Sequence, residues 1–408
     1  MHNDRLKYYL KNYILQVHAD LMVRIHIICI LSALLLSGCK RSGETPPTTE
    51  SQEHMEGSIR IDPLGAMPSG ESINQYTLIN RNGLQMQVIN YGGTITSLKT
   101  PDRNGTMEEI VLGCDSLQDY LDGTPFFGSL VGRYGNRIAG AQFVLDGTTY
   151  SLAKNNNGNH IHGGVRGFDK VYWHIEPVEV EEGPTLKLSY VSPDMEEGYP
   201  GNLSVEVVYT LSNNNELIID YTANTDKKTI INLTNHSYFN LTGDAKRNVL
   251  DHEVVIHASR FVPVDKQLIP EGGLAEVADT PFDFRTSTRI GARIDDNHPQ
   301  IVNGRGYDHC WVLDGEPGAL KLGATVYEPA SGRVLELHTT EPGVQLYTGN
   351  FLNGSQIGKG GRAYDKRDGF CLETEHFPDS PNQPDFPSVV LSPGETYKTR
   401  TVFAFSAR

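Results

Sequence analysis

Short stretches of alternating apolar and polar residues, interrupted by tight-turn dipeptides, restrict the fold of this chain more than any other feature. The clearest turn dipeptides are Asn82-Gly83, Asn104-Gly105 and Asp146-Gly147. Asparagine, aspartate and glycine readily take the positive φ angles that the tightest β-hairpins require. The run from Gln142 to Tyr150 places one such pair between two alternating stretches. It therefore predicts two short strands joined by a turn.

The same alternation continues from about Tyr76 to the end of the chain, and no long segment shows the 3.6-residue apolar spacing of a helix. No internal repeat of fixed period is present. A hydrophobic share of 38% is enough for a large core. We therefore predict an all-β body, one large antiparallel β-sandwich with two sheets packed face to face. Further strands are expected at 203–211, 216–222, 253–257, 333–339 and 399–405.

The N-terminal region has the pattern of a targeting segment. A basic start near Met22 precedes a short apolar run, which ends in Leu36-Ser37-Gly38-Cys39. This ending resembles a bacterial lipobox, and the run is too short to span a bilayer comfortably. We expect residues 1–38 to be a signal segment, with Met22 as a candidate true start, and Cys39 to be lipidated. A signal peptide without lipid is the alternative.

Residues 39–70 are rich in Ser, Thr, Pro, Gly and Glu, which predicts a flexible tether before a folded domain at 71–408. Beyond the tether lie Cys114, Cys310 and Cys371. Their odd number and wide spacing predict neither a disulfide framework nor a zinc site. A single disulfide between Cys310 and Cys371 stays open.

The chain is acidic, with a formal net charge of −15. That charge argues against nucleic acid and against an anionic membrane surface as partners. One short acidic run, Asp194, Glu196 and Glu197, offers oxygen ligands of the kind that calcium uses. A solvated loop is the commoner role of such a run.

The stretch from Ile231 to Leu241 is unusually polar for a strand-like segment, with amides, hydroxyls and one imidazole where a core strand would carry valine or isoleucine. Each buried polar group without a partner would cost about 1–3 kcal/mol. These groups therefore either satisfy one another or face a polar ligand such as a sugar. His236, at the centre, could exchange a proton near neutral pH.

Two other clusters combine glycine with basic side chains. Gly132 to Ile138 carries Arg133 and Arg137, whose guanidinium forks suit either ligand clamping or a structural salt bridge. His160 and His162 lie two apart, so on a strand they would share a face, as paired metal ligands do. No third ligand is nearby in sequence. We therefore expect no metal site, with one histidine binding the ligand and the other packing.

Three clusters in the last third add acids and aromatic residues. Asp308 stands close to Trp311, a pairing that sugar sites use because pyranose rings present apolar C–H faces beside hydroxyls. The second cluster runs from Glu341 to Phe351 and the third from Gly369 to Asp379. In the third, Glu373 follows an apolar run, which places it at the end of a core strand. There it is either a base with a tuned pKa or an ordinary exposed glutamate.

In this order, the clusters resemble the aldose 1-epimerase (galactose mutarotase) family over roughly residues 71–408. The resemblance implies a galactose mutarotase-like supersandwich that interconverts the α and β anomers of free aldohexoses such as galactose and glucose. It implies His236 as general acid and Glu373 as general base. It also implies no required metal, nucleotide or redox cofactor, and we expect a monomer. The residues implied to hold the sugar hydroxyls are Asn136, Arg137, His162, Tyr238, Asp308 and Gln345.

Other functions remain as alternatives. Asp308 and Glu373 could be the carboxylate pair of a glycosidase, although His236 would then have no role. A non-catalytic carbohydrate-binding lipoprotein would keep the cleft without turnover. Arg133 and Arg137 keep a hexose-6-phosphate 1-epimerase open. The lipobox is not part of the usual cytoplasmic enzyme, so we expect lipid anchoring in a bacterial cell envelope, facing the periplasm or the exterior.

Overall fold

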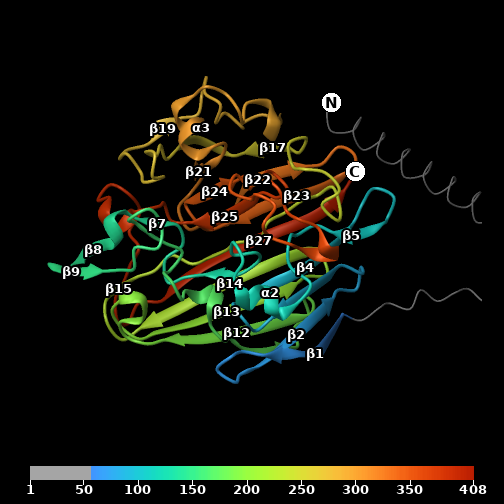
Figure 1. The fold of residues 1–408 in the computed structure, drawn as a ribbon, viewed down its shortest axis with the longest axis horizontal. Coiled ribbons are helices and arrows are strands. Elements are labelled where there is room, and N and C mark those ends of the chain that lie inside the picture. The colour runs from blue at the N-terminus through green and yellow to red at the C-terminus, as the bar shows by residue number, and fades with distance from the viewer. Residues whose placement is uncertain (1–56) are drawn as a thin grey trace, which may run out of the picture. The chain divides into compact units, whose positions relative to one another are not determined.

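The computed structural model describes residues 57–408, and its elements are almost all strands (Figure 1). The α-helices within this range are α2 (Leu117–Asp122) and α3 (Pro299–Gly304), each six residues long. The predicted all-β antiparallel architecture is therefore confirmed. The signal segment, Cys39 and most of the predicted tether lie outside the described residues. Within residues 57–408, no helix is long and apolar enough to cross a membrane.

A nine-stranded antiparallel sheet is the largest unit of the fold. Its central strand, β27 (Tyr397–Ala407), pairs on either side with strands that come from far earlier in the chain. The spatial order is β11 (His174–Val178), β12 (Thr185–Ser192), β13 (Leu203–Leu211), β14 (Glu216–Thr225), β27, β23 (Arg333–Thr339), β22 (Lys321–Tyr327), β17 (Glu253–Ile256) and β20 (Thr288–Arg289).

Two five-stranded sheets complete the main architecture, so the two-sheet prediction was coarser than the fold. One has the order β1 (Ser58–Ala66), β2 (Ser72–Ile79), β3 (Gln85–Ile89), β4 (Thr94–Pro101) and β5 (Met107–Glu109). The other has the order β19 (Ala275–Glu276), β18 (Ala258–Phe261), β21 (Asp308–Leu313), β24 (Gly343–Tyr347) and β25 (Cys371–Glu375). Figure 1 shows β21, β24 and β25 side by side. Strands β21 and β25 carry the acidic side chains described below, and β24 lies between them.

Four short two-stranded pairs accompany these sheets within the described residues. They are β7 (Arg137–Ile138) with β10 (His160–Ile161), β6 (Leu130–Val131) with β16 (Thr234–Asn235), β8 (Gln142–Leu145) with β9 (Thr148–Ser151), and β15 (Thr229–Ile230) with β26 (Val390–Leu391). The β8–β9 pair is the hairpin predicted around Asp146-Gly147, and both residues have the expected positive φ angles of 50° and 76°. Asn82-Gly83 and Asn104-Gly105 likewise join β2 to β3 and β4 to β5.

The folded body begins earlier than residue 71. Strand β1 covers Ser58–Ala66, within the stretch expected to be tether, and pairs with β2 along its length. Most of its side chains are exposed, so it lacks the buried alternating face by which a strand is recognised in a sequence. Backbone pairing with β2, rather than burial, therefore holds it in place.

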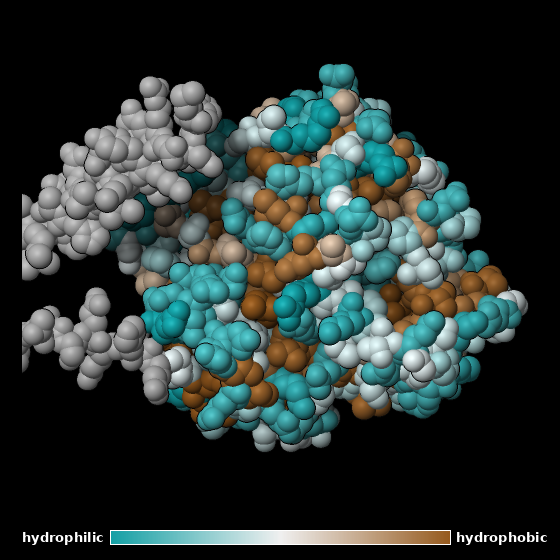
Figure 2. Space-filling view, turned by 180° about the vertical axis from the view of Figure 1, so that it is seen from behind, coloured by the Kyte–Doolittle hydropathy of each residue, from teal (hydrophilic) through white to brown (hydrophobic). Residues whose placement is uncertain are grey.

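The largest hydrophobic cluster of the body has Trp173, Trp311, Leu186 and Phe239 among its most buried members, and three smaller clusters accompany it within the described residues. The strand alternation explains it, because one face of each strand turns inward. The surface seen from behind mixes small hydrophobic patches with hydrophilic residues (Figure 2), which is ordinary for a protein of this size. Cys114, Cys310 and Cys371 are all buried free thiols, so the disulfide left open between the last two does not form.

Candidate active site

A cleft of about 380 Å³ collects most of the predicted site residues. The strands β7, β21 and β25, and the segments that follow β10 and β16, supply its walls. Seven of the eight residues named from the resemblance line it: Asn136, Arg137, His162, His236, Tyr238, Asp308 and Glu373. The eighth, Gln345, lies beneath Asp308 rather than in the wall. Residues more than 230 positions apart in the sequence thus meet in one cavity.

The register of β21, β24 and β25 places three of these side chains on one sheet face. Gln345 of β24 pairs directly with Glu373 of β25, and Asp308 of β21 pairs with Tyr347, two positions from Gln345. Since side chains alternate across a strand, Asp308, Gln345 and Glu373 point the same way. The sequence predicted Glu373 at the end of a strand, but it occupies the middle of β25. It is only 2% exposed.

His236 follows directly after β16 and is held in plane by aromatic rings. Tyr238 stacks on the imidazole at 5.0 Å between ring centroids, and Phe126 stacks at 5.7 Å. Its Nε2 lies 3.6 Å from Oε2 of Glu373, and its Nδ1 lies 3.4 Å from Sγ of Cys371. The ring is therefore fixed with one nitrogen toward the predicted base and the other toward a thiol.

The electrostatics of this pair are set by burial. Burial lowers the pKa of His236 to about 4, because the imidazolium loses its hydration. Burial, and next the charge of Asp308, raise the pKa of Glu373 to about 8, while Arg137 opposes the rise. Oε2 of Glu373 has no hydrogen-bond partner within the described residues. Near neutral pH the two groups together therefore share one titratable proton. Oε2 of Glu373 is free to bind a ligand hydroxyl.

Asp308 is clamped by two donors. Nε2 of Gln345 donates to Oδ1 at 2.7 Å, and Nη2 of Arg137 lies 3.6 Å from Oδ2. Burial raises the pKa of Asp308, and Arg137 counteracts this. A carboxylate held in this way is oriented to accept hydrogen bonds from the hydroxyls of a bound polyol.

A second chain of contacts fixes His162. The backbone N–H of Asn136 donates to Nδ1 of His162 at 3.2 Å, and Nδ2 of Asn136 donates to Oε1 of Glu375 at 2.9 Å. Burial, followed by His236, holds the pKa of His162 well below its usual value, so the ring is neutral. With Nδ1 accepting, the ring proton is assigned to Nε2. His162 can therefore donate a hydrogen bond into the cleft.

His162, His236 and Glu373 also form a geometric triad, with ligand atoms within 4.8 Å of one another. Such a set resembles a two-histidine, one-carboxylate metal site. A metal at His162 would need a nitrogen lone pair. The hydrogen bond from Asn136 occupies Nδ1, and the ring proton occupies Nε2. The triad is arranged for hydroxyl hydrogen bonds rather than for a metal ion.

Tyr238 contributes its ring rather than its hydroxyl. The hydroxyl donates to the carbonyl of Pro125 at 2.9 Å. The stacked face of the ring supports His236, and its edge meets Tyr347 at 5.8 Å between centroids. Its place in the cleft is as predicted, but with its proton donated to Pro125 the hydroxyl can meet a sugar hydroxyl only as an acceptor.

Sequence reasoning missed several residues at the site: Phe126, Tyr347, Phe351, Cys371 and Glu375. Three of them carried a signal. Tyr347 lies two residues from Gln345, and Cys371 and Glu375 lie two residues from Glu373, so period-two alternation puts them on the same sheet face. Phe126 stands in a loop where nothing in the sequence points to the cleft.

Other predicted candidates have structural roles. Arg133 is 2% exposed and donates to Ser192 and to the carbonyls of Pro193 and Pro200, away from the cleft. Tyr199 and the carbonyl of Ala153 bind the two ring nitrogens of His160. These two side chains therefore position loops and do not face the ligand.

The acidic run considered for calcium is also satisfied internally. Glu196 accepts from Tyr190 and Ser192, and Glu197 accepts from the backbone N–H groups of Val165 and Arg166. Asp194 accepts from the backbone of Gly201. These bonds favour a structural loop over a calcium site.

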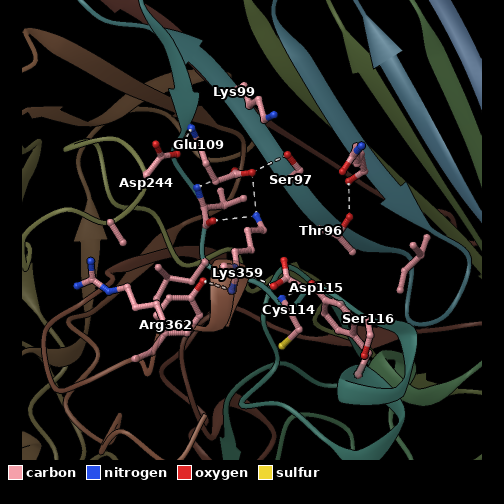
Figure 3. A pocket seen from close by; sticks show the side chains of 18 of the residues that line it. Thr96, Ser97, Lys99, Glu109, Cys114, Asp115, Ser116, Asp244, Lys359 and Arg362 are labelled. Atoms are coloured by element: carbon pink, nitrogen blue, oxygen red, sulfur yellow. Dashed lines mark hydrogen bonds and ion pairs between the residues drawn. The ribbon is translucent and has the colours of Figure 1, made fainter. Parts of the chain in front are cut away.

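A second cavity, of about 430 Å³, lies elsewhere on the body, against the sheet that begins with β1 (Figure 3). Its central carboxylate, Glu109, accepts from Ser97 at 2.6 Å and from the backbone N–H of Leu98 at 2.7 Å, and pairs with Lys359 at 2.9 Å. Lys359 also donates to the carbonyl of Val111. The charged groups at its centre are thus bound to one another, unlike Glu373 in the first cleft.

The fold and the first cleft together define a class of protein. A β-sandwich that buries a proton-sharing imidazole and carboxyl beside fixed hydroxyl-binding groups suits a small polyhydroxylated ligand, and can exchange protons with it.

Comparison with known proteins gives the family. A family model for aldose 1-epimerase matches residues 74–404. Galactose mutarotase from Bos taurus is 48% identical over 343 residues, 84% of this chain and 97% of the relative. Aldose 1-epimerase from Escherichia coli (strain K12) is 38% identical over 344 residues, 83% of this chain and 97% of the relative. The solved galactose 1-epimerase from Lactobacillus acidophilus NCFM has a TM-score of 0.76 at 30% identity, covering 86% of this chain and 99% of that one. The chain belongs to the aldose 1-epimerase family, and the resemblance seen in the sequence is confirmed.

Proposed function

We propose that this protein is an aldose 1-epimerase that interconverts the α and β anomers of free aldohexoses, galactose and glucose among them. One observation carries the proposal. His236 and Glu373 are buried side by side in a cleft lined by hydroxyl-binding groups, with Nε2 and Oε2 3.6 Å apart. The names of the relatives from Bos taurus and Escherichia coli support the same substrate class.

The reaction uses this pair as acid and base. Glu373 takes the proton of the anomeric hydroxyl while Nε2 of His236 gives a proton to the ring oxygen, and the bond between the anomeric carbon and that oxygen breaks. The open-chain aldehyde rotates about its first carbon–carbon bond. On closure His236 takes the proton of the attacking hydroxyl, and Glu373 returns its proton to the aldehyde oxygen. Protons balance over the cycle, and the chemistry requires only these side chains.

The other cleft residues hold the sugar while this happens. Asp308, fixed by Arg137 and Gln345, accepts from ring hydroxyls, and His162 donates to one through Nε2. Phe126 and the ring of Tyr238 bound the pocket with apolar surface that suits the C–H face of a pyranose. Each positioned acid or base typically contributes about 10²–10⁴-fold to the rate.

Polarimetry tests this proposal. Freshly dissolved α-glucose and α-galactose should relax to equilibrium faster with the protein than without it. Glu373→Gln and His236→Asn should each lower kcat by about 10²–10⁴-fold. His252→Asn is the matched control, because His252 is also buried and its pKa is also lowered to about 4 by burial, but it lies outside the cleft wall, where its Nε2 accepts from the backbone N–H of Leu241. Sugar binding without faster relaxation would instead support a non-catalytic binding protein.

Two enzymatic alternatives lose support. Arg133 is buried away from the cleft, so the arginine pair that kept a hexose 6-phosphate substrate open does not exist there. For a glycosidase, Asp308 would have to act as an acid or nucleophile, yet Gln345 and Arg137 hold it as an oriented acceptor. Nitrophenyl glycosides should accordingly remain uncleaved in the same assay.

We also propose that the protein is lipid-anchored through Cys39 in a bacterial cell envelope, facing the periplasm or the exterior, and acts there as a monomer. The support is the basic start, apolar run and Leu36-Ser37-Gly38-Cys39 ending. Fractionation of cells that express the wild type and Cys39→Ala tests the anchor. The wild type should sediment with membranes and the variant should be released. A variant that stays in the membrane fraction would remove the basis for lipidation. Size-exclusion chromatography of the released form measures its oligomeric state.

A further inference from the structure

We propose that Cys371 is a positioning residue that keeps one proton on Nδ1 of His236, so that Nε2 remains free to exchange protons with the sugar. The inference deepens the proposed epimerase activity and rests on it. The cysteine does not touch the substrate, since it is absent from the cleft wall.

The geometry places one strand behind both nitrogens of the imidazole. Cys371 and Glu373 are two residues apart on β25, so their side chains leave the same sheet face. Sγ of Cys371 lies 3.4 Å from Nδ1 of His236, and Oε2 of Glu373 lies 3.6 Å from Nε2. Among the side-chain hydrogen bonds of the described residues, the thiol is the one partner that His236 has.

Stacking alone cannot orient the ring. Tyr238 and Phe126 hold the plane of the imidazole, but a half-turn about the Cβ–Cγ bond would leave that plane unchanged while exchanging each ring nitrogen with a ring carbon. A contact at the edge of the ring is needed to distinguish the two orientations. Sγ of Cys371 is that contact.

The reaction decides which nitrogen must keep its proton. During ring opening Nε2 gives up a proton, and during closure the same atom must accept one. A neutral imidazole can accept at Nε2 only if its remaining proton is on Nδ1. Sγ would then accept a hydrogen bond from Nδ1–H throughout the cycle. The buried thiol is neutral, because burial raises the pKa of Cys371 well above its usual value.

Sulfur suits this role because it is a weak acceptor. A carboxylate in its place would stabilise the imidazolium and make it a poorer acid. The thiol orients the ring without adding a charge, and His236 keeps a lowered pKa. Cys371 thus fixes the tautomer of His236 and leaves its imidazolium ready to give up a proton.

The structure offers a matched control in Cys310. This thiol is also a fully buried, free cysteine on the same sheet, but its Sγ donates to the carbonyl of Trp311, at 3.8 Å, and not to His236. Replacing it removes a buried thiol of the same size and exposure. Any effect shared by Cys310→Ala and Cys371→Ala would therefore be a packing effect.

The experiment combines nitrogen NMR with kinetics on the folded protein. In protein labelled with ¹⁵N-histidine, the His236 signal is assigned by its loss in His236→Asn. The wild type should show the proton on Nδ1 at neutral pH. Cys371→Ala should shift the signal toward the Nε2–H form and lower kcat about 10-fold with little change in KM. Cys371→Ser, which restores an acceptor, should recover the Nδ1–H form, and Cys310→Ala should match the wild type in both readouts.

Two results would overturn the proposal. One is a wild-type ring that carries its proton on Nε2. The other is a Cys371→Ala protein with the wild-type tautomer and the wild-type kcat. Failure of the epimerase proposal looks different, since the wild type itself would then not accelerate anomer relaxation, whatever the tautomer of His236.

Discussion

At the scale of single residues, the chemistry of this protein depends on how burial separates two pKa values. Burial raises the pKa of Glu373 to about 8 and lowers the pKa of His236 to about 4. The pair therefore shares one titratable proton at every pH between these two values. The two values belong to the pair, because moving the proton from one group to the other leaves the proton count unchanged. The catalytic arrangement, with the proton on His236, belongs to this one-proton state.

This sharing predicts a wide, bell-shaped dependence of kcat/KM on pH. Above about pH 8 the pair loses its proton and the acid is gone, so activity falls. Below about pH 4 a second proton binds and the base is gone, so activity falls again. Unshifted groups would instead confine activity between about pH 4.3 and 6.5. Relaxation rates measured by polarimetry from pH 3 to 10, corrected for the buffer reaction, distinguish the two profiles.

An alkaline limb centred near pH 6.5 would contradict the assignment, because it would mean that His236 titrates as an exposed imidazole. His252→Asn should keep the wild-type profile, since His252 lies outside the cleft wall. The amide variant Glu373→Gln should lose the shared titration along with most of its rate.

At the scale of elements, the resemblance to a known family, rather than strand alternation, made much of the site predictable. It named Asp308, Gln345 and Glu373, and the strands that carry these residues pair in one sheet. The pairing of β24 between β21 and β25 could not be predicted, because it depends on contacts between segments far apart in the chain. The place of Phe126 in the cleft wall and the burial of Arg133 away from the cleft could not be predicted for the same reason.

The segment after β10 offers an element-scale prediction at Gly163. It has φ of +79°, and a Cβ added there would lie 1.7 Å from the carbonyl oxygen of Gly132. Gly163→Ala should therefore force this segment away from the loop before β7, and lower the free energy of unfolding by about 2–4 kcal/mol. Because His162 is the preceding residue, KM for galactose should also rise. Chemical denaturation and polarimetry measure the two effects.

Gly147→Ala provides the comparison. Gly147 has a similar φ of +76° at the β8–β9 turn, but a Cβ there would meet nothing within 4 Å. Its substitution should cost only the left-handed backbone penalty of about 1–2 kcal/mol, with KM unchanged. Equal effects of the two substitutions on stability and KM would show that close approach to Gly132 does not matter.

At the scale of the whole molecule, the sequence predicted the all-β class but not the grouping of strands into three main sheets. The central strand β27 comes last in the chain and joins β14 to β23, so the largest sheet is complete only when the C-terminal segment is in place. The link between this sheet and the sheet of β1 to β5 could not be predicted from the sequence either. The residue that makes it is a buried arginine, and arginine is usually found on protein surfaces.

That residue is Arg333, at the start of β23. It is 1% exposed, its Nη2 lies 3.1 Å from Oε2 of Glu108, and it donates to the carbonyls of Thr100, Thr106 and Leu241. These partners belong to β4, to the β4–β5 turn, to β5 and to the end of the polar segment that contains His236. One guanidinium therefore bonds the nine-stranded sheet to a second sheet and to the segment behind the active site.

Arg333→Met keeps much of the side-chain volume but leaves buried acceptors unpaired, so it should lower the free energy of unfolding by about 3–5 kcal/mol. Arg400→Met removes a surface pair with Asp220, where the arginine side chain is 49% exposed, and should cost about 0–1 kcal/mol. Urea titrations of both variants measure the difference. If Arg333→Met costs no more than Arg400→Met, the sheets are held together by apolar packing alone. If it unfolds in two separate transitions, Arg333 is what makes the sheets unfold as one unit.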